Sequence, residues 1–152
     1  MTDLSQPEID HLLVLEKRFV EPDPVELPGP GETIIRDLES LDATESFVLD
    51  IDRSAIRLTK QKIQGRARRV YPLLRLCIGD TRRHRNPDGK VVVGSHLHIR
   101  NEPWGDRHAI PVPDAFTDVN SLDKALSDFL NYFNVVGRYT IEPTLFFVQD
   151  GF

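Results

Sequence analysis

The chain has 152 residues, of which 39% are hydrophobic and 28% charged, and its formal net charge is −5. This length suits one compact hydrophobic core, so we expect a single domain over residues 1–152. The acidic balance does not favour a protein that binds nucleic acid over its whole surface, so any such contact must be local. The sequence has no run of 18 apolar residues and no hydrophobic leader, so we expect neither a membrane span nor a signal peptide.

One cysteine, Cys77, stands in the apolar stretch LLRLCIGD. A lone cysteine cannot form an intramolecular disulfide, and this is typical of a cytoplasmic protein. Its apolar neighbours predict a buried, inert thiol.

The first predicted element is a helix over about residues 5–20. Ser5 is its expected N-cap, with Pro7 and Glu8 in the first turn. Apolar residues then recur near helical spacing: Ile9, Leu12, Leu13, Leu15, Phe19 and Val20. The proline-rich stretch over about 21–31 ends the helix and predicts a stiff connector.

A sheet is predicted over about residues 32–113, where short β-rich runs alternate with tight turns. The runs are TIIRDLES, SFVLDIDR, AIRLTKQKIQGR, PLLRLCIG, VVVGSHLHI and RHAIPVP. Short connections favour antiparallel neighbours, so the simplest topology is a meander of five to six strands. A second helix is predicted over about 121–134, with Ser121 as its cap and Gly137 after its end. The fold class is therefore α+β: an antiparallel meander sheet with an N-terminal and a C-terminal helix.

The stretch HRNPDGKVVVGSHLHIR predicts a hairpin with its turn at Asn86–Gly89. A three-residue loop pairs Asn86 with Lys90 and, carried along the strands, sets Ile78 opposite His98. A buried apolar face instead requires Ile78 opposite Leu97. A bulge at Gly79 or Gly94 would reconcile the two registers.

In either register Leu97 and Ile99 point into the core, and His96 and His98 point outward on the opposite face. This face is either an ordinary solvated strand surface or a site. Many basic and aromatic residues lie nearby in the sequence, which favours a site. They are Arg82, Arg83, His84, Arg85, Arg100, Trp104, Arg107 and His108.

Three chemistries suit these residues. Metal binding is the first, because His96, His98 and Glu102 match part of the first cupin motif. Lys90 stands where that motif has glycine and no second motif follows, so we expect no metal and no cofactor. The second is metal-independent RNA cleavage, with two histidines as acid and base. The third is binding alone, with basic residues on phosphates and Trp104 or Tyr71 stacked on bases.

A basic segment, Asp52 to Arg69, has seven arginines and lysines and a single carboxylate. Its alternation predicts Ile56, Leu58 and Ile63 inward and the basic side chains outward. Lysines on an edge strand also prevent unwanted pairing, so a solvated edge is one interpretation. A phosphate-facing surface is the other, because the rest of the chain is strongly acidic. It would use Arg53, Arg57, Lys60 and Lys62.

Several stretches in this order resemble an uncharacterised family of small bacterial proteins, a domain of unknown function, with the pattern HxNPDG followed by HLHI. The stretches are LDIDRSAIRL, QGRARR, HRNPDG, HLHIR, WGDRHAIPVP and DFLNYFNV. The resemblance implies a bacterial or mobile-element source and no assigned function. The hairpin alone is also similar to that of TumE-type toxins, whose motif ends in a His-His-x-His cluster. That likeness touches His84, His96 and His98, although Ser95 stands where the toxin has an adjacent histidine.

The sequence hypothesis is thus a cytoplasmic, toxin-like ribonuclease that needs no metal. His96 and His98 act as acid and base, His84 assists, and Arg100 with Arg82 or Arg83 holds the phosphate. The alternative is a non-enzymatic factor of mobile elements that binds RNA, other nucleic acid or a protein, in the manner of an antitoxin or an anti-defence factor. Expected partners are accordingly RNA and a cognate antitoxin or other protein, with no membrane.

Overall fold

A seven-stranded antiparallel sheet forms the body of the molecule, with strand order β1-β3-β4-β5-β6-β9-β10. The computed structural model describes residues 3–57, 59–79 and 81–142. The strands are β1 (Lys17–Phe19), β3 (Thr33–Ser40), β4 (Ser46–Arg53), β5 (Gln61–Ala67), β6 (Tyr71–Ile78), β9 (His96–Ile99) and β10 (Ala109–Pro111). The central strands follow one another as antiparallel neighbours, which confirms the predicted meander, but the strand count exceeds the five to six expected.

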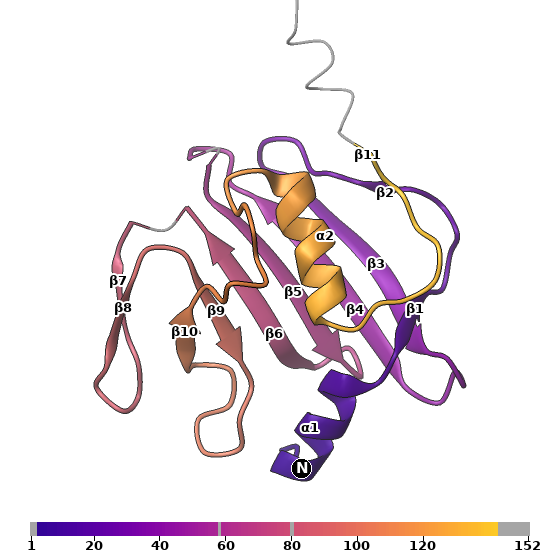
Figure 1. The fold of residues 1–152 in the computed structure, drawn as a ribbon, viewed down its shortest axis with the longest axis horizontal. Coiled ribbons are helices and arrows are strands. Elements are labelled where there is room, and N and C mark those ends of the chain that lie inside the picture. The colour runs from indigo at the N-terminus through magenta and orange to yellow at the C-terminus, as the bar shows by residue number, and fades with distance from the viewer. Residues whose placement is uncertain (1–2, 58, 80, 143–152) are drawn as a thin grey trace, which may run out of the picture.

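Two small ribbons accompany this sheet. One is the hairpin of β7 (Arg83–Arg85) and β8 (Val91–Val93), which projects at one end of the molecule (Figure 1). The other pairs β2 (Val25–Glu26) in parallel with β11 (Ile141–Glu142). The predicted connector over 21–31 therefore contains a short strand, and the predicted strand VVVGSHLHI is divided into β8 and β9.

The first helix, α1 (Gln6–Val14), has Ser5 as its N-cap as predicted, and Ser5 forms a capping box with Glu8. Its predicted extent to residue 20 is wrong, because β1 follows directly. The reason lies at Lys17, whose side chain is fully buried and whose Nζ donates to the carbonyl oxygens of Leu13, Leu15 and Phe133 at 2.8–3.1 Å. Burial lowers the pKa of Lys17 to about 7. These bonds use the orphan carbonyls at the end of α1, so the chain leaves the helix there and joins the sheet edge.

The second helix, α2 (Leu122–Tyr132), lies across one face of the sheet (Figure 1). Ser121 is its N-cap residue as predicted, although its hydroxyl bonds Asp123 and no helix amide. Leu126, Phe129 and Phe133 join the inward residues of β4, β5, β6 and β9 in one core, to which α1 adds Ile9 and Leu12. Both described helices therefore contribute to the core on one side of the sheet. The opposite side carries the polar residues of the central strands.

Neither described helix has the length and apolar character that a membrane-spanning helix requires.

Candidate anion pocket and histidine cluster

The register of the strands sets polar side chains in two rows across the face of the sheet opposite α2. Direct partners in neighbouring antiparallel strands point to the same side. The first row is Thr33, Asp52, Lys62, Cys77 and His96. The second row is Ile35, Asp50, Gln64, Arg75 and His98. We call this surface the polar face.

At the β9 end of the polar face three histidine rings meet. The ring centroids of His96 and His98 are 4.9 Å apart. The ring centroid of His84 lies 5.2 Å from that of His96 and 5.0 Å from that of His98. We call these rings the histidine cluster. Leu97 is fully buried on the core side as predicted, and Ile99 is half-buried. The predicted exposure of the histidines is wrong, because only 3% of His96 and 4% of His98 is accessible.

The β7–β8 hairpin causes this burial by placing His84 against the other two rings. Its turn lies at Asn86–Gly89 with Asn86 bonded to Lys90, as predicted. The Asn86 side chain donates to the carbonyl of Ala109 at 2.7 Å and accepts from the amide of Ala109 at 2.8 Å. These two buried bonds clamp the hairpin to β10, which is why it covers the histidines instead of extending into solvent.

The ladder between β6 and β9 follows neither register considered from the sequence. Leu76 pairs with Leu97, whereas the turn register would set it opposite Arg100, a shift of three residues. β6 ends just before Gly79, and Gly94 lies between β8 and β9; these are the two positions expected to hold a bulge. Both glycines have a positive φ, 75° and 83° respectively. A side chain at Gly79 would also place its Cβ 2.2 Å from the carbonyl oxygen of Thr59. Glycine there lets the β4–β5 loop approach the end of β6.

Hydrogen bonds to the backbone fix the histidine tautomers. His96 Nδ1 lies 2.8 Å from the Gly94 carbonyl, which can only accept, so Nδ1 carries the proton and Nε2 keeps a lone pair. His98 Nδ1 is buried and has no hydrogen-bond partner among the described residues. Burial, with Arg75 as the next cause, lowers the pKa of His98 to about 4. His98 is therefore neutral at physiological pH, which does not suit the general acid of the predicted ribonuclease.

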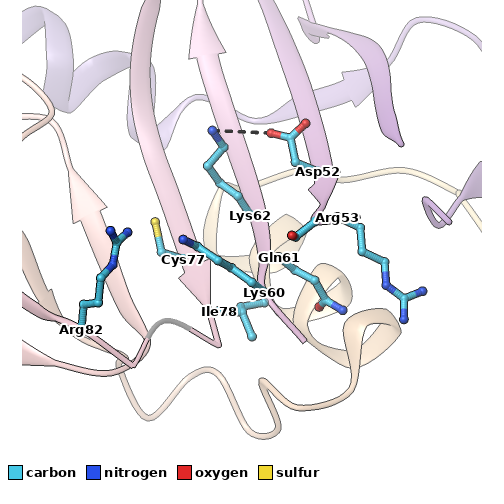
Figure 2. Close-up of a pocket in the computed structure, with 9 residues that line it drawn as sticks. Asp52, Arg53, Lys60, Gln61, Lys62, Cys77, Ile78 and Arg82 are labelled. Atoms are coloured by element: carbon cyan, nitrogen blue, oxygen red, sulfur yellow. Dashed lines mark ion pairs between the residues drawn. The ribbon is translucent and has the colours of Figure 1, made fainter. Parts of the chain in front are cut away.

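A pocket of about 450 Å³ lies beside the β4–β5 loop, where Asp52, Lys62 and Cys77 of the polar face line it. Its lining comprises four basic residues and one carboxylate, together with Ser54, Gln61, Cys77 and Ile78. The basic residues are Arg53, Lys60, Lys62 and Arg82, and the carboxylate is Asp52. Figure 2 shows Arg82 on one side of Cys77, with Lys62 joined to Asp52, at 3.5 Å between Nζ and Oδ2. We call this the basic pocket.

Four of the predicted phosphate-binding residues line the basic pocket and four do not. Arg57 is exposed in the loop between β4 and β5, and Arg83 is exposed on β7. Arg100 is buried and its guanidinium lies 3.1 Å from Asp3. Trp104 stacks on His108 with a centroid distance of 5.2 Å. The predicted phosphate clamp by Arg100 is therefore replaced by an ion pair with the N-terminal segment.

The basic pocket also contains residues that sequence reasoning missed. Cys77 is half-exposed, so the prediction of a buried thiol is wrong. Its position between Leu76 and Ile78, both buried in the core, could have placed it on the polar face by alternation. Ile56 is also not inward as predicted but 92% exposed, because β4 ends at Arg53 and β5 begins only at Gln61. Ile63 is buried as predicted, and Leu58 lies outside the described residues.

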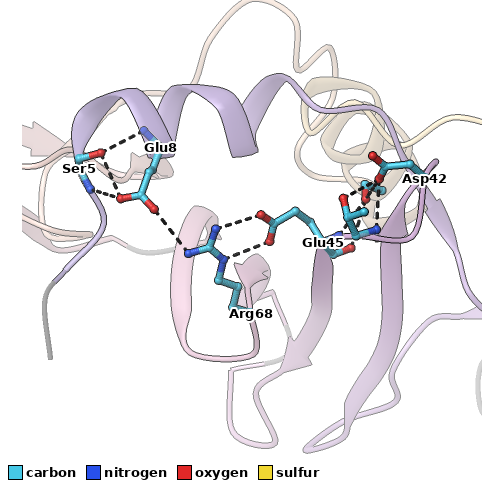
Figure 3. Close-up of polar contacts among 7 residues, drawn as sticks. Ser5, Glu8, Asp42, Glu45 and Arg68 are labelled. Carbon is cyan, nitrogen blue, oxygen red and sulfur yellow. Dashed lines mark hydrogen bonds and ion pairs between the residues drawn. The ribbon is translucent and has the colours of Figure 1, made fainter.

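The other half of the basic segment is bound by carboxylates. Arg66 forms two hydrogen bonds to Asp50, at 2.7 and 3.0 Å. Arg68 forms two hydrogen bonds to Glu45, at 3.0 and 2.9 Å, and also lies 3.6 Å from Glu8 of α1 (Figure 3). These arginines hold β5 to its neighbours and so have a structural role.

The fold and site together define a small α+β domain with a polar sheet face, on which a basic pocket adjoins a buried histidine cluster. The chain belongs to a family of unknown function, DUF6978, whose model matches residues 4–135. This confirms the resemblance to an uncharacterised domain family. No curated protein and no solved structure gives a significant match.

Proposed function

We propose that this protein binds single-stranded RNA through its phosphates at the basic pocket. The observation that carries the proposal is the presence of four basic residues and a single carboxylate among the residues that line one pocket. Their excess positive charge is complementary to a polyanion, and the net charge of −5 leaves the rest of the surface unsuited to one.

Further basic residues are exposed elsewhere on the same segments: Arg57 on the β4–β5 loop, and Arg83, Arg85 and Lys90 on the β7–β8 hairpin. Tyr71 and Trp104, the two aromatic residues expected to stack on bases, do not line the pocket. Binding should therefore depend on phosphates and vary little with base sequence.

RNA cleavage by the histidines is the second candidate. One observation favours it: His84, His96 and His98 converge with centroid distances of about 5 Å, and Cys77 connects their row to the basic pocket. A general acid or base must come within hydrogen-bond reach of the proton it transfers. Because His96 and His98 are almost fully buried, binding ranks ahead of cleavage.

The test measures affinity for fluorescent single-stranded RNA of mixed sequence against salt concentration. If three or four phosphates are contacted, log affinity should fall against log salt with a slope of about −2 to −3, at roughly 0.7 per phosphate. Salt-independent binding would contradict the proposal.

The same RNA, recovered after long incubation, tests the second candidate. If the RNA stays intact while the protein is bound to it, the protein binds RNA without cleaving it. Cleavage that His98→Ala lowers by about 10²-fold, with affinity unchanged within a few fold, would establish the acid–base role.

A further inference from the structure

We propose that Cys77, His96 and His98 form a transition-metal site for which zinc is the best-suited ion. The inference is independent of the proposed function. One ligand atom from each residue lies within 4.8 Å of the other two. Thiolate and imidazole are the donors that zinc prefers, and two histidines with one cysteine supply three protein ligands.

The strand register creates this site. Cys77 on β6 is the direct partner of His96 on β9, and His98 lies two residues farther along the same face. Metal binding therefore requires no new backbone arrangement. In a tetrahedral zinc site the donor atoms lie about 3.3–3.6 Å apart, since Zn–S is about 2.3 Å and Zn–N about 2.0–2.1 Å. Binding would therefore draw the three donor atoms, now within 4.8 Å of one another, closer together.

The histidines are oriented as metal ligands usually are. A metal-bound histidine commonly donates its other ring N–H to a backbone carbonyl, which fixes the tautomer. His96 does this through Nδ1 to Gly94, so Nε2 is left with its lone pair. His98 forms a backbone hydrogen bond with Asp106, and its Nδ1 has no partner among the described residues.

An unpartnered buried nitrogen is the second observation that points to a ligand. Buried polar atoms are nearly always hydrogen-bonded, and leaving one unpaired is destabilising. The ring of His98 packs edge-to-face against His84 of the clamped hairpin, with 5.0 Å between the ring centroids. A metal ion accepting the lone pair of His98 Nδ1 would remove this deficit.

The sequence predicted no metal because the cupin spacing is incomplete. The structure assembles a different set, in which Cys77 from the neighbouring strand takes the place of the expected carboxylate. Glu102 points elsewhere, since its Oε1 accepts from the backbone amide of Gln6 at 2.7 Å. Three protein ligands leave a fourth position, and Cys77 also lines the basic pocket. A zinc ion here would thus lie at the border of that pocket.

The experiment uses the purified full chain, stripped with a chelator and reloaded with one equivalent of zinc or cobalt. We expect about one zinc per chain after dialysis, and a thiolate-to-cobalt charge-transfer band in the cobalt form, since the thiolate is the coordinating species. Cys77→Ser should abolish the band, and His96→Gln should abolish stoichiometric retention. His108→Gln, a histidine outside the proposed ligand set, is the matched control and should behave like wild type.

A measurement on the wild type alone guards against variants that do not fold. Zinc should slow alkylation of Cys77 by about tenfold or more, and a chelator should reverse this, because the free thiolate is the reactive species. Loss of all bound metal on dialysis would overturn the proposal. Equal retention by wild type and Cys77→Ser, or an alkylation rate unchanged by zinc, would also overturn it.

Discussion

The two ends of the basic segment differ in what their charges contact. At one end, which we call the paired end, Arg66, Arg68 and Arg69 each lie within 3.3 Å of a carboxylate, from Asp50, Glu45 and Asp37 respectively. At the other end is the basic pocket, where Asp52 is the only carboxylate among the lining residues. The sequence shows one uniform run of positive charge, and the fold divides it into a structural half and a half suited to an external anion.

The position of the acidic partners explains the division. Asp37 and Asp50 lie on β3 and β4, and Glu45 directly precedes β4. Asp50 is only 8% exposed, and a carboxylate so nearly buried needs hydrogen-bonded partners. The lining of the pocket instead has four basic residues and one carboxylate. Charge density in a sequence therefore identifies candidates, and the structure shows which of them line one pocket.

The largest expected effect compares equal charge changes at the two ends. Lys60→Gln with Lys62→Gln should weaken binding of single-stranded RNA by about 100-fold, because two phosphate contacts are lost. Arg68→Gln with Arg69→Gln changes the net charge by the same amount and should leave affinity within a few fold. Fluorescence anisotropy at one salt concentration measures both. Equal losses in the two variants would mean that overall charge, and not the pocket, determines binding.

The next effect concerns the two Asn86 hydrogen bonds that clamp the β7–β8 hairpin to β10. Asn86→Ala removes both hydrogen bonds to Ala109 and leaves that backbone N–H and C=O without their partners. We expect the free energy of unfolding to fall by about 2–3 kcal/mol. Urea denaturation measures it, with the exposed Asn131→Ala as control. A loss below about 0.5 kcal/mol would show that water replaces the clamp.

The sequence predicts much of this fold because its strongest signals are local. Alternation at Leu97 places the histidines on the face away from the core, and the Asn86–Gly89 turn follows from proline and glycine at fixed positions. The capping residue Ser5 is likewise identified by its own neighbours. Each of these features depends on residues close together in the chain.

What the sequence does not predict depends on contacts between distant segments. The burial of His96 results from a hairpin clamped by Asn86 to Ala109, 23 residues away. The end of α1 results from Lys17 reaching the Phe133 carbonyl, 116 residues away. Cys77 joins the histidine cluster only because of a β6–β9 register that neither turn chemistry nor alternation defines. Such pairings have no local signature.

A smaller effect tests the structural role of the paired end. Arg66→Met removes two hydrogen bonds from Asp50 and leaves this nearly buried carboxylate with Gln64 at 3.2 Å. Unpairing such a charge should lower the free energy of unfolding by about 2 kcal/mol. Adding Asp50→Asn should restore part of the loss, because no buried charge is then left unpaired. Additive losses in urea denaturation would show that Arg66 does not stabilise Asp50.

The smallest effect is a dependence on pH at the same end. The hydrogen bond from Arg68 is the main cause that lowers the pKa of Glu45, and burial opposes it. A carboxyl group with a depressed folded-state pKa stabilises the fold above its unfolded pKa, about 4.5, and loses that contribution as the pH falls through the folded value. The difference in unfolding free energy between wild type and Arg68→Gln should therefore be largest near pH 7, at less than about 1 kcal/mol for so exposed a pair, and should shrink as the pH falls below the unfolded pKa of about 4.5. The exposed Arg138→Gln is the control and should show no such trend. If the difference stays constant between pH 7 and pH 3, Arg68 stabilises the protein by packing and not by its charge, and the paired end owes less to ion pairing than its geometry indicates.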